Sequence, residues 1–568
     1  MLGKRSAQTQ LFDVGNVYPL SLPESSFHGQ LAKAGPHLFR DEDFLAFYCE
    51  RYGRPSVPPS LLALMLLLQF EAGVSDEEAV LRTAYDLRWA AVLGRPAGEP
   101  LCAKSTFQLF RAHLVLHEQV RVILLSSIEE AKRTGLLKGQ ALRVALDTKP
   151  IDGRGAVLDT YNLLAAGIRK LASGMARVKR KKPERWMCSH GLERYLEPSI
   201  KGSVEIDWSD PEARDGFLSQ IVADARQLLA LAESEPSVRE ASELLRKLLL
   251  QDIEEDTSSG GEPKAKIKDG TARERIPSIS DPEQRHGRKS KSTRFVGSKA
   301  AIAVDTDSQI ILATAVLSGN DGDALGALEL VEQAESNSGA RIVEAIADCA
   351  YGSGQTREQF ADSDRTLIAK VPKDPERDGL YPKSAFAIDL DRMCVSCPAG
   401  HTLTRFVSCA DGRREFRFGH LCRDCPLQSR CTKSPRGRKV CLSPQEALLQ
   451  SAREYQATPE GRARLKERVV VEHRLARLGQ LGIGQARYVG RKATEFQLAV
   501  ASAVANLRRA WNWERSQWKK APLGFQPAHR IRTQSPITYL EALCRFLTTK
   551  QRPATALTSG ERDFRLGF

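Results

Sequence analysis

Long hydrophobic runs are missing from this sequence. The longest, Leu61 to Phe70, is about half of the ~20 apolar residues that a membrane-spanning helix needs. The basic N-terminus, Met1 to Ser6, is not followed by the apolar core of a signal peptide. A phosphate-binding loop of the Walker type is also missing, so ATP is not implied. We therefore expect a cytoplasmic protein with no membrane partner, and we find no internal repeat.

Positively charged residues outnumber negatively charged ones in this sequence. The chain of 568 residues has 84 Lys and Arg against 70 Asp and Glu, which gives a formal net charge of +14. Such a surplus favours a polyanionic partner, because neutralising phosphates releases counterions. Charge alone leaves open a basic protein that binds no nucleic acid. The length indicates about two to four domains. The 12 cysteines in a reducing compartment are more typical of metal ligands or buried thiols than of disulfides.

The first region, residues 1–139, is predicted to be helical. Pro58 and Pro59 precede the apolar run Leu61–Leu68, and Gly73 ends it. Ser75 with Glu78, and Ser105 with Gln108, have the spacing of capping boxes. Short capped helices fit a helix-turn-helix DNA reader and equally fit a plain helical bundle. We favour an N-terminal DNA-binding domain.

Strand and helix patterns then follow in a definite order. Strands are expected at 142–147, 300–304, 309–316, 342–347 and 366–371, and helices at 161–250, 323–335 and 355–361. A flexible linker is expected at 256–270. This order predicts an α/β fold: an RNase H-like catalytic core at 140–388 with a helical insertion at about 160–290. A basic run in that insertion, Arg177, Lys179, Arg180, Lys181 and Lys182, is either a solvated face or a phosphate-contacting patch.

Three carboxylates stand where metal-dependent chemistry would need them. Asp147 and Asp348 each follow an apolar strand, and neighbouring parallel strands would bring them to one sheet edge. Glu472 lies in the helical region 442–513 that is expected to complete the core. Clustered carboxylates repel one another unless a cation lies between them, and Mg²⁺ prefers oxygen ligands. Asp152 and Asp305 are competitors, which we interpret as turn residues.

Cysteines concentrate in residues 389–441, a predicted zinc-ribbon-like insert. Cys394 with Cys397, and Cys422 with Cys425, form two CxxC pairs, which are typical of tetrahedral zinc sites. We expect a structural Zn²⁺ there, with Cys431 as an alternate ligand, or else a knuckle without metal. Cys349 beside Asp348 has no partner histidine that would make it a nucleophile.

The combined motifs resemble those of DDE-type insertion-sequence transposases, most closely the insertion-sequence eleven-eighty-two family. The resemblance rests on VALDTKPI at 144–151, ADCAYGSG at 347–354, EHRLARL at 472–478 and RYVG at 487–490, and it covers roughly residues 10–513. It implies Asp147, Asp348 and Glu472 as the metal-binding triad, with two Mg²⁺ or Mn²⁺ ions. Related chains often have a Tyr and a Lys at the positions where this chain has Leu465 and Gly479.

The resemblance also implies DNA as the partner. The candidate DNA-binding residues are Arg468, His473, Arg477, Arg487 and Tyr488. The implied function is cleavage at terminal inverted repeats followed by transfer of the freed 3′-hydroxyl into target DNA, by a homodimer on paired ends. The alternatives are an inactive transposase-derived DNA-binding protein and a nuclease of the same fold that does not join DNA. The segment 514–568 is interpreted only as a C-terminal tail.

Overall fold

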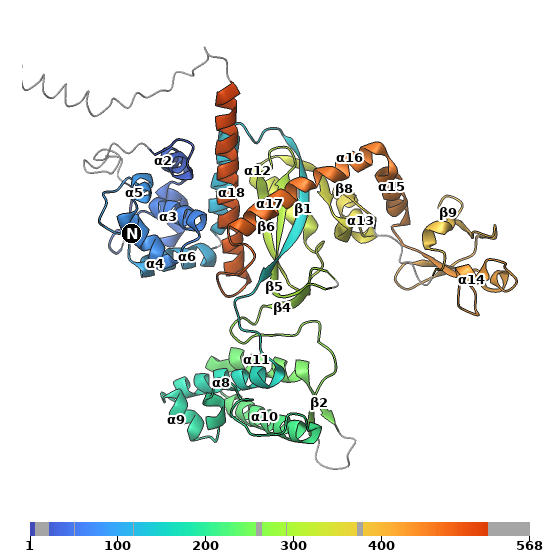
Figure 1. Ribbon diagram of the computed structural model, residues 1–568, viewed down its shortest axis with the longest axis horizontal. Coiled ribbons are helices and arrows are strands. Elements are labelled where there is room, and N and C mark those ends of the chain that lie inside the picture. Colours follow the sequence, from blue (N-terminus) through green and yellow to red (C-terminus); the bar gives the residue numbers. More distant parts are fainter. Residues whose placement is uncertain are drawn as a thin grey trace, which may run out of the picture.

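The computed structural model describes residues 1–5, 22–49, 52–117, 119–256, 264–290, 292–371 and 379–520. Helices form the N-terminal part, a mixed sheet lies at the centre, and two further units project from it (Figure 1). In those ranges no helix has the length and apolar character required to cross a membrane. Most of the predicted tail lies outside the described residues.

The N-terminal region is helical, as predicted. Its elements are α2 (Phe27–Leu38), η1 (Asp41–Phe47), α3 (Pro59–Ala72), α4 (Asp76–Tyr85), α5 (Leu87–Leu93), α6 (Lys104–Leu116) and α7 (Val120–Arg133). Gly73 ends α3 with a φ of 66°, and Ser75 caps α4 by accepting a hydrogen bond from the backbone of Glu78 at 3.2 Å. The second predicted capping box is wrong, because α6 begins at Lys104 and Ala103 is its N-cap.

A six-stranded sheet forms the centre of the molecule. Its strands are β1 (Ala141–Asp152), β4 (Arg285–Arg288), β5 (Arg294–Asp305), β6 (Ile311–Ser318), β7 (Arg341–Ala347) and β8 (Thr366–Ala369). β6 pairs with β5 and β5 with β1, both antiparallel, whereas β1, β7 and β8 run parallel in that order. The short β4 pairs with the start of β5. In the chain, α12 (Ala327–Ser338) connects β6 with β7, and α13 (Gly354–Asp362) connects β7 with β8.

The two faces of the sheet belong to different hydrophobic cores, and alternate side chains of β1 point into one or the other. Leu142, Val144 and Leu146 pack with α7 and α12 on one face. Ala145 and Ile151 belong to the core that α3 and the last two helices form on the other face. Successive side chains of a strand point to opposite faces, so Asp147 and the residues at 149 and 151 share the second face.

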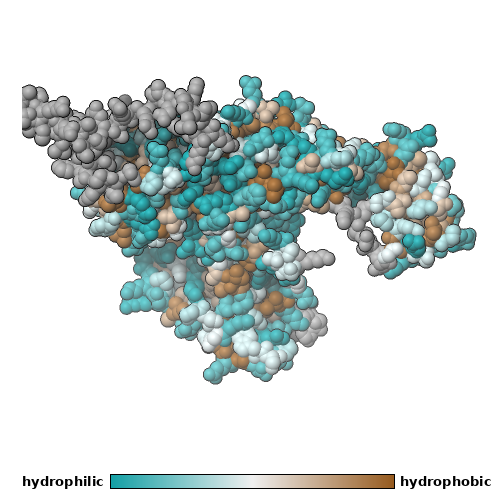
Figure 2. Space-filling model, turned by 45° about the horizontal axis from the view of Figure 1, so that its top comes forward, coloured by the Kyte–Doolittle hydropathy of each residue, from teal (hydrophilic) through white to brown (hydrophobic). Residues whose placement is uncertain are grey.

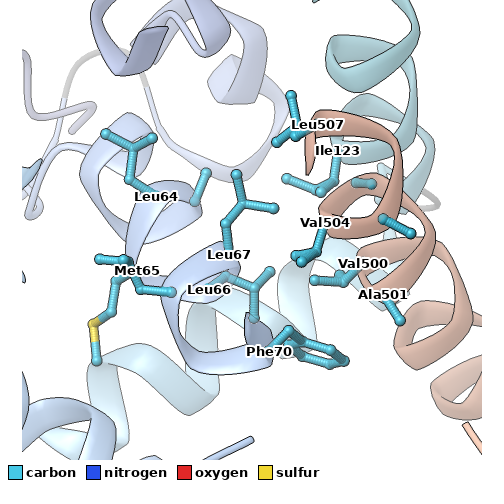
Figure 3. Close-up of a cluster of buried hydrophobic side chains, with 14 of the residues drawn as sticks. Leu64, Met65, Leu66, Leu67, Phe70, Ile123, Val500, Ala501, Val504 and Leu507 are labelled. Carbon is cyan, nitrogen blue, oxygen red and sulfur yellow. The ribbon is translucent and has the colours of Figure 1, made fainter. Parts of the chain in front are cut away.

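The last helices are α15 (Glu446–Ala457), α16 (Pro459–Glu467), α17 (Val469–Gln480) and α18 (Arg491–Lys520). Of these, α17 and α18 cover that second face, whereas α16 packs against β7 and β8 and α15 packs against α13. Side chains of α3, α7 and α18 interdigitate in one cluster (Figure 3), in which Leu67 and Val504 are fully buried. Burial of this kind contributes about 1.5–3 kcal/mol for each large aliphatic side chain, so α18 joins the N-terminal helices to the sheet. The helical prediction for 459–513 is confirmed, with a break at 481–490.

The segment between β1 and β4 is a separate helical unit. It contains α8 (Thr160–Val178), α9 (Pro183–Cys188), η2 (Glu193–Leu196), α10 (Pro211–Ala232), η3 (Pro236–Val238), α11 (Arg239–Asp252), and the hairpin strands β2 (Ile253–Asp256) and β3 (Lys264–Ile267). It has its own core. The predicted linker is wrong at its ends, which form the hairpin, and 257–263 lie outside the described residues. The basic run 177–182 is exposed at the end of α8, apart from the half-buried Val178.

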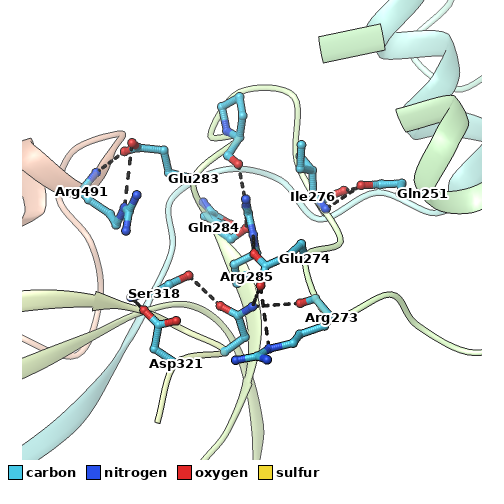
Figure 4. A network of polar contacts seen from close by, with 12 residues as sticks. Gln251, Arg273, Glu274, Ile276, Glu283, Gln284, Arg285, Ser318, Asp321 and Arg491 are labelled. Carbon is cyan, nitrogen blue, oxygen red and sulfur yellow. Dashed lines mark hydrogen bonds and ion pairs between the residues drawn. The ribbon is translucent and has the colours of Figure 1, made fainter. Parts of the chain in front are cut away.

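A polar network ties this unit to the sheet (Figure 4). Arg285 at the start of β4 bonds to Glu274, which also accepts a hydrogen bond from Asn320 at 2.8 Å. Glu283 accepts a hydrogen bond from the backbone of Arg491, the first residue of α18, at 2.6 Å. The chain leaving the insertion is therefore fixed to the sheet and to α18 together.

The cysteine-containing segment forms the second projecting unit. Its elements are η5 (Lys383–Ala385), β9 (Ala387–Asp389), β10 (Cys394–Ser396), β11 (Thr402–Leu403), β12 (Val407–Ser408), β13 (Arg414–Arg417), η6 (Gly419–Cys422), α14 (Gln428–Cys431) and β14 (Lys439–Leu442). They make two small three-stranded sheets. The unit extends away from the body of the molecule (Figures 1 and 2).

Candidate active site

Asp147 and Asp348 come from neighbouring parallel strands at the same level. Ala145 on β1 pairs with Ile346 on β7, so two further steps along each strand bring Asp147 beside Asp348. Asp147 lies within β1 and not at its end, which corrects the expected strand boundary, because pairing with β5 continues to Asp152. Asp348 directly follows β7, and its carboxylate caps η4 (Cys349–Tyr351) by accepting the Ala350 N–H at 2.8 Å.

Glu472 is brought to the same place by α17. Arg468, one helical turn earlier, donates to Asp147 Oδ2 at 2.9 Å and forms a second ion pair with Glu472. The Arg468 guanidinium thus lies between a carboxylate of β1 and a carboxylate of α17. Arg468 therefore links Asp147 with Glu472, and Asp348 is close enough for its charge to act on Asp147.

The electrostatics of Asp147 reflect this crowding. Burial raises the pKa of its carboxyl group, and the charges of Asp348 and Glu472 raise it further, whereas the Thr148 N–H and Arg468 lower it. The net direction is upward, so the negative charge on Asp147 is incompletely compensated. In the part of the chain that the structure describes, no three His, Cys, Asp or Glu side chains stand close enough together to hold a metal ion.

Two residues near the carboxylates were not singled out from the sequence. Lys149 shares the strand face of Asp147, and its side chain makes no hydrogen bond or ion pair with any described residue. Its Nζ lies beside Gly479, 2.8 Å from where a Cβ would stand there. Tyr351 is 1% exposed, and its pKa is raised well above its usual value by burial and then by Asp147, Asp323 and Asp348. Residues two apart in a strand share a face, and this spacing from Asp147 is the sequence signal that could have identified Lys149.

The two competing aspartates lie outside this group. Asp152 pairs through its backbone with Gly484 and Ala486 at 2.9 and 2.7 Å, and its side chain is exposed. Asp152 is the last residue of β1, so the prediction that it lies in a turn is wrong. Asp305 is 2% exposed and accepts hydrogen bonds from the backbone and hydroxyl of Ser308. It is the hairpin-turn residue that the sequence predicts.

The candidate DNA-binding residues differ in accessibility. Arg468 is engaged with carboxylates, and His473 is exposed. Arg477 pairs with Glu71 of α3 at 3.5 Å. A DNA contact for these residues stays a prediction.

The loop between α17 and α18 packs against the N-terminal helices. Arg487 bonds to the carbonyl of Val74, and Tyr488 lies under the Arg111 guanidinium at 5.1 Å from its ring centre. Both side chains therefore have a structural function between the helical region and the sheet, and the DNA role predicted for them is untested.

The cysteines fall into two sets. Cys397, Cys422, Cys425 and Cys431 line one small cavity, whereas Cys394 does not. Burial raises the pKa of the Cys431 thiol, and the three other cysteines of the cavity raise it further against the lowering effect of Arg438. The cysteines of this unit form no disulfide. Of the predicted ligands, Cys394 is outside this cavity and the alternate, Cys431, lines it; a zinc-binding role for any of them stays a prediction.

Comparison with known proteins gives two family matches. Residues 396–511 match the family described as transposase DDE domain, and residues 21–113 match the family described as transposase domain (DUF772). The first segment contains Glu472 and Arg468; Asp147 and Asp348 lie outside both segments. No curated protein and no solved structure gives a significant match.

Proposed function

The two family matches indicate a DDE-type insertion-sequence transposase, and from that premise we propose that Asp147, Asp348 and Glu472 are its catalytic residues. The observation that carries this assignment is the shared register of the two aspartates on β1 and β7, with Glu472 joined to Asp147 through Arg468. On its motifs we assign the chain to the insertion-sequence eleven-eighty-two family.

We propose an RNase H-like fold for the core. Three antiparallel strands (β6, β5, β1) are followed across the sheet by two parallel ones (β7, β8), and α17 and α18 cover one face. The carboxyl ends of parallel strands are where α/β folds place their sites. In this arrangement the helical insertion lies between the first and second strands, and the cysteine unit precedes the helix of Glu472.

The donor chemistry of the three carboxylates fits Mg²⁺ or Mn²⁺, because both prefer oxygen ligands. A pair of such ions, when bound, stabilises the attacking and leaving oxygens of a displacement at phosphorus. The pKa of Asp147 is raised first by burial and then by the charges of Asp348 and Glu472, and a cation bound among these carboxylates would offset the repulsion between them. Arg468 supplies part of that positive charge here. On DNA binding its guanidinium would turn to a backbone phosphate, and Lys149 would contact a second phosphate beside it.

The proposed reaction is hydrolysis of the phosphodiester at a terminal inverted repeat, followed by attack of the freed 3′-hydroxyl on target DNA. The N-terminal helices and the basic run 177–182 are the surfaces we propose for recognising the element ends. A homodimer would hold the two ends together. The three carboxylates would position the reacting groups, and no residue needs to form a covalent bond to DNA.

Cleavage of labelled DNA that carries the element's own ends tests this proposal. Wild type should nick at one fixed position with Mg²⁺ or Mn²⁺ and not with chelator, and Asp348→Asn should abolish nicking. Asp152→Asn is the matched control, because this exposed aspartate lies on β1 outside the carboxylate group, and it should cleave like wild type. Binding without cleavage under any metal would favour an inactive DNA-binding protein. Nicking without strand transfer would favour a nuclease that does not join.

A further inference from the structure

The cysteine unit has a very small core. Eight buried residues make up its hydrophobic cluster, and two of them are Cys422 and Cys431. A core of this size rarely stabilises a unit by itself, and small units commonly add a disulfide or a metal. The cysteines of this unit are all free, so a metal is the remaining means of stabilisation.

Four thiols from three separate turns face one cavity of about 20 Å³. Cys397 closes a tight turn after β10, in which its N–H donates to the His401 carbonyl at 2.8 Å and Gly400 has a φ of 88°. Cys422 ends η6, and Cys431 ends α14. A cavity of this volume holds one water-sized particle. The chain therefore folds back so that its thiols surround a space for a single ion.

Strand geometry explains why Cys394 is outside this set. Val395 is fully buried in the cluster that contains Cys422 and Cys431, and partly buried Cys397 packs against it. Because side chains alternate along a strand, Cys394 lies on the face of β10 opposite to Val395. Cys397 follows the end of β10, and its turn brings it against the cluster that contains Val395.

The surroundings of the cavity suit thiolate ligands. The backbone N–H of Arg438 donates to Cys422 Sγ at 3.4 Å, and such outer hydrogen bonds orient and stabilise metal ligands. The Arg438 side chain donates to the carbonyls of Cys431 and Tyr381, each at 3.0 Å. Arg438 lines the same cavity as the four cysteines, so its positive charge lies close to them.

We propose that Cys397, Cys422, Cys425 and Cys431 bind one structural Zn²⁺ in tetrahedral S₄ geometry. Four thiolates at about 2.3 Å from zinc are an ordinary structural site. The thiols line the cavity without being drawn together to that distance, so binding would close the turns around the ion and release the thiol protons. This site is independent of the carboxylate group and of the proposed reaction.

Zinc analysis of the full chain tests the ligand set. Wild type purified with zinc should hold about one ion per chain, and Cys431→Ser should lose it. Cys394→Ser, the matched control from the CxxC pair, should keep it. Co²⁺ in place of zinc should give the intense visible bands of tetrahedral thiolate coordination, unchanged in His401→Ala. Zinc-free wild type after reconstitution, or loss of zinc in Cys394→Ser but not in Cys431→Ser, would overturn the assignment.

A second measurement needs no variant. Alkylation of wild type, read by mass spectrometry, should label the exposed Cys188 readily and spare the four cavity cysteines until a zinc chelator is added. Equal labelling with and without chelator would refute the site even where a substituted chain fails to fold. Since neither readout depends on DNA cleavage, failure of the zinc site and failure of the proposed catalytic function would be distinguishable.

Discussion

Replacing Arg468 by alanine should tighten metal binding at the carboxylates in the absence of DNA. In the structure the Arg468 guanidinium is ion-paired to Asp147 and Glu472. A divalent cation binding to these two carboxylates has to displace it, so the arginine competes with the metal. Removing the competitor should raise metal affinity, although the same substitution should reduce DNA cleavage because a phosphate contact is lost.

The size of the effect follows from the exposure of the pairs. The side chains of Arg468 and Asp147 are 25% and 18% exposed, and that of Glu472 is 48% exposed. Exposed ion pairs contribute about 0.2–1 kcal/mol each, and the half-buried pair with Asp147 belongs at the upper end. Together the two pairs amount to about 1.4 kcal/mol, which corresponds to about tenfold in dissociation constant.

The assay is titration of DNA-free protein with Mn²⁺, with free Mn²⁺ followed by electron paramagnetic resonance. Lys466→Ala is the control: it removes an exposed positive charge two residues away with no contact to the carboxylates, and its affinity should change little. An unchanged or weaker Mn²⁺ affinity in Arg468→Ala would show that the arginine does not compete with the metal, and the reasoning would fail.

Two other predictions concern the same edge of the sheet. Lys149→Ala should weaken binding of DNA ends and lower the slope of log K against log salt by about one, as expected for one lost phosphate contact; Lys149→Arg should restore both, and an unchanged slope would exclude a phosphate contact. The raised pKa of Asp147 means that protons compete with metal there, so Mn²⁺ affinity should begin to fall at a pH above the usual carboxyl range. Arg468→Ala should move that fall to higher pH, and a fall confined to the ordinary carboxyl range would contradict the burial argument.

The ends of several helices and turns could be predicted because the residues that determine them are close together in the sequence. Pro59 and Gly73 bound α3, and the β5–β6 hairpin turns at Asp305, as expected. The strand through Asp147 was predicted too short, since its end depends on pairing with β5, more than 140 residues away. The cap at Ser105 was wrong because α6 begins two residues before the predicted start, at Lys104 with Ala103 as its N-cap, an error typical of predicted helix ends.

Within the candidate site, spacing could indicate the three carboxylates but not what lies between them. That Arg468 contacts Asp147 is a fact of tertiary packing, because 321 positions separate the two along the chain. Spacing also favoured Cys394, whereas in the structure Cys397 and Cys431 pack in one cluster with Val395. Arg487 and Tyr488 look like free polar residues in the sequence, and only the docking of α18 against α3 shows them to be packed.

The position of the helical insertion has a consequence for synthesis on the ribosome. β1 pairs with β5 across 145 to 161 intervening positions, from Asp152 with Gly297 to Val144 with Asp305. At about 5–20 residues per second, β1 would wait roughly 10–30 s for its partner strand. The insertion, with a core of its own, can fold during that interval and shorten the loop that β5 has to close. The carboxylate edge of the sheet is then among the last parts of the molecule to assemble, after the helices of the insertion have folded.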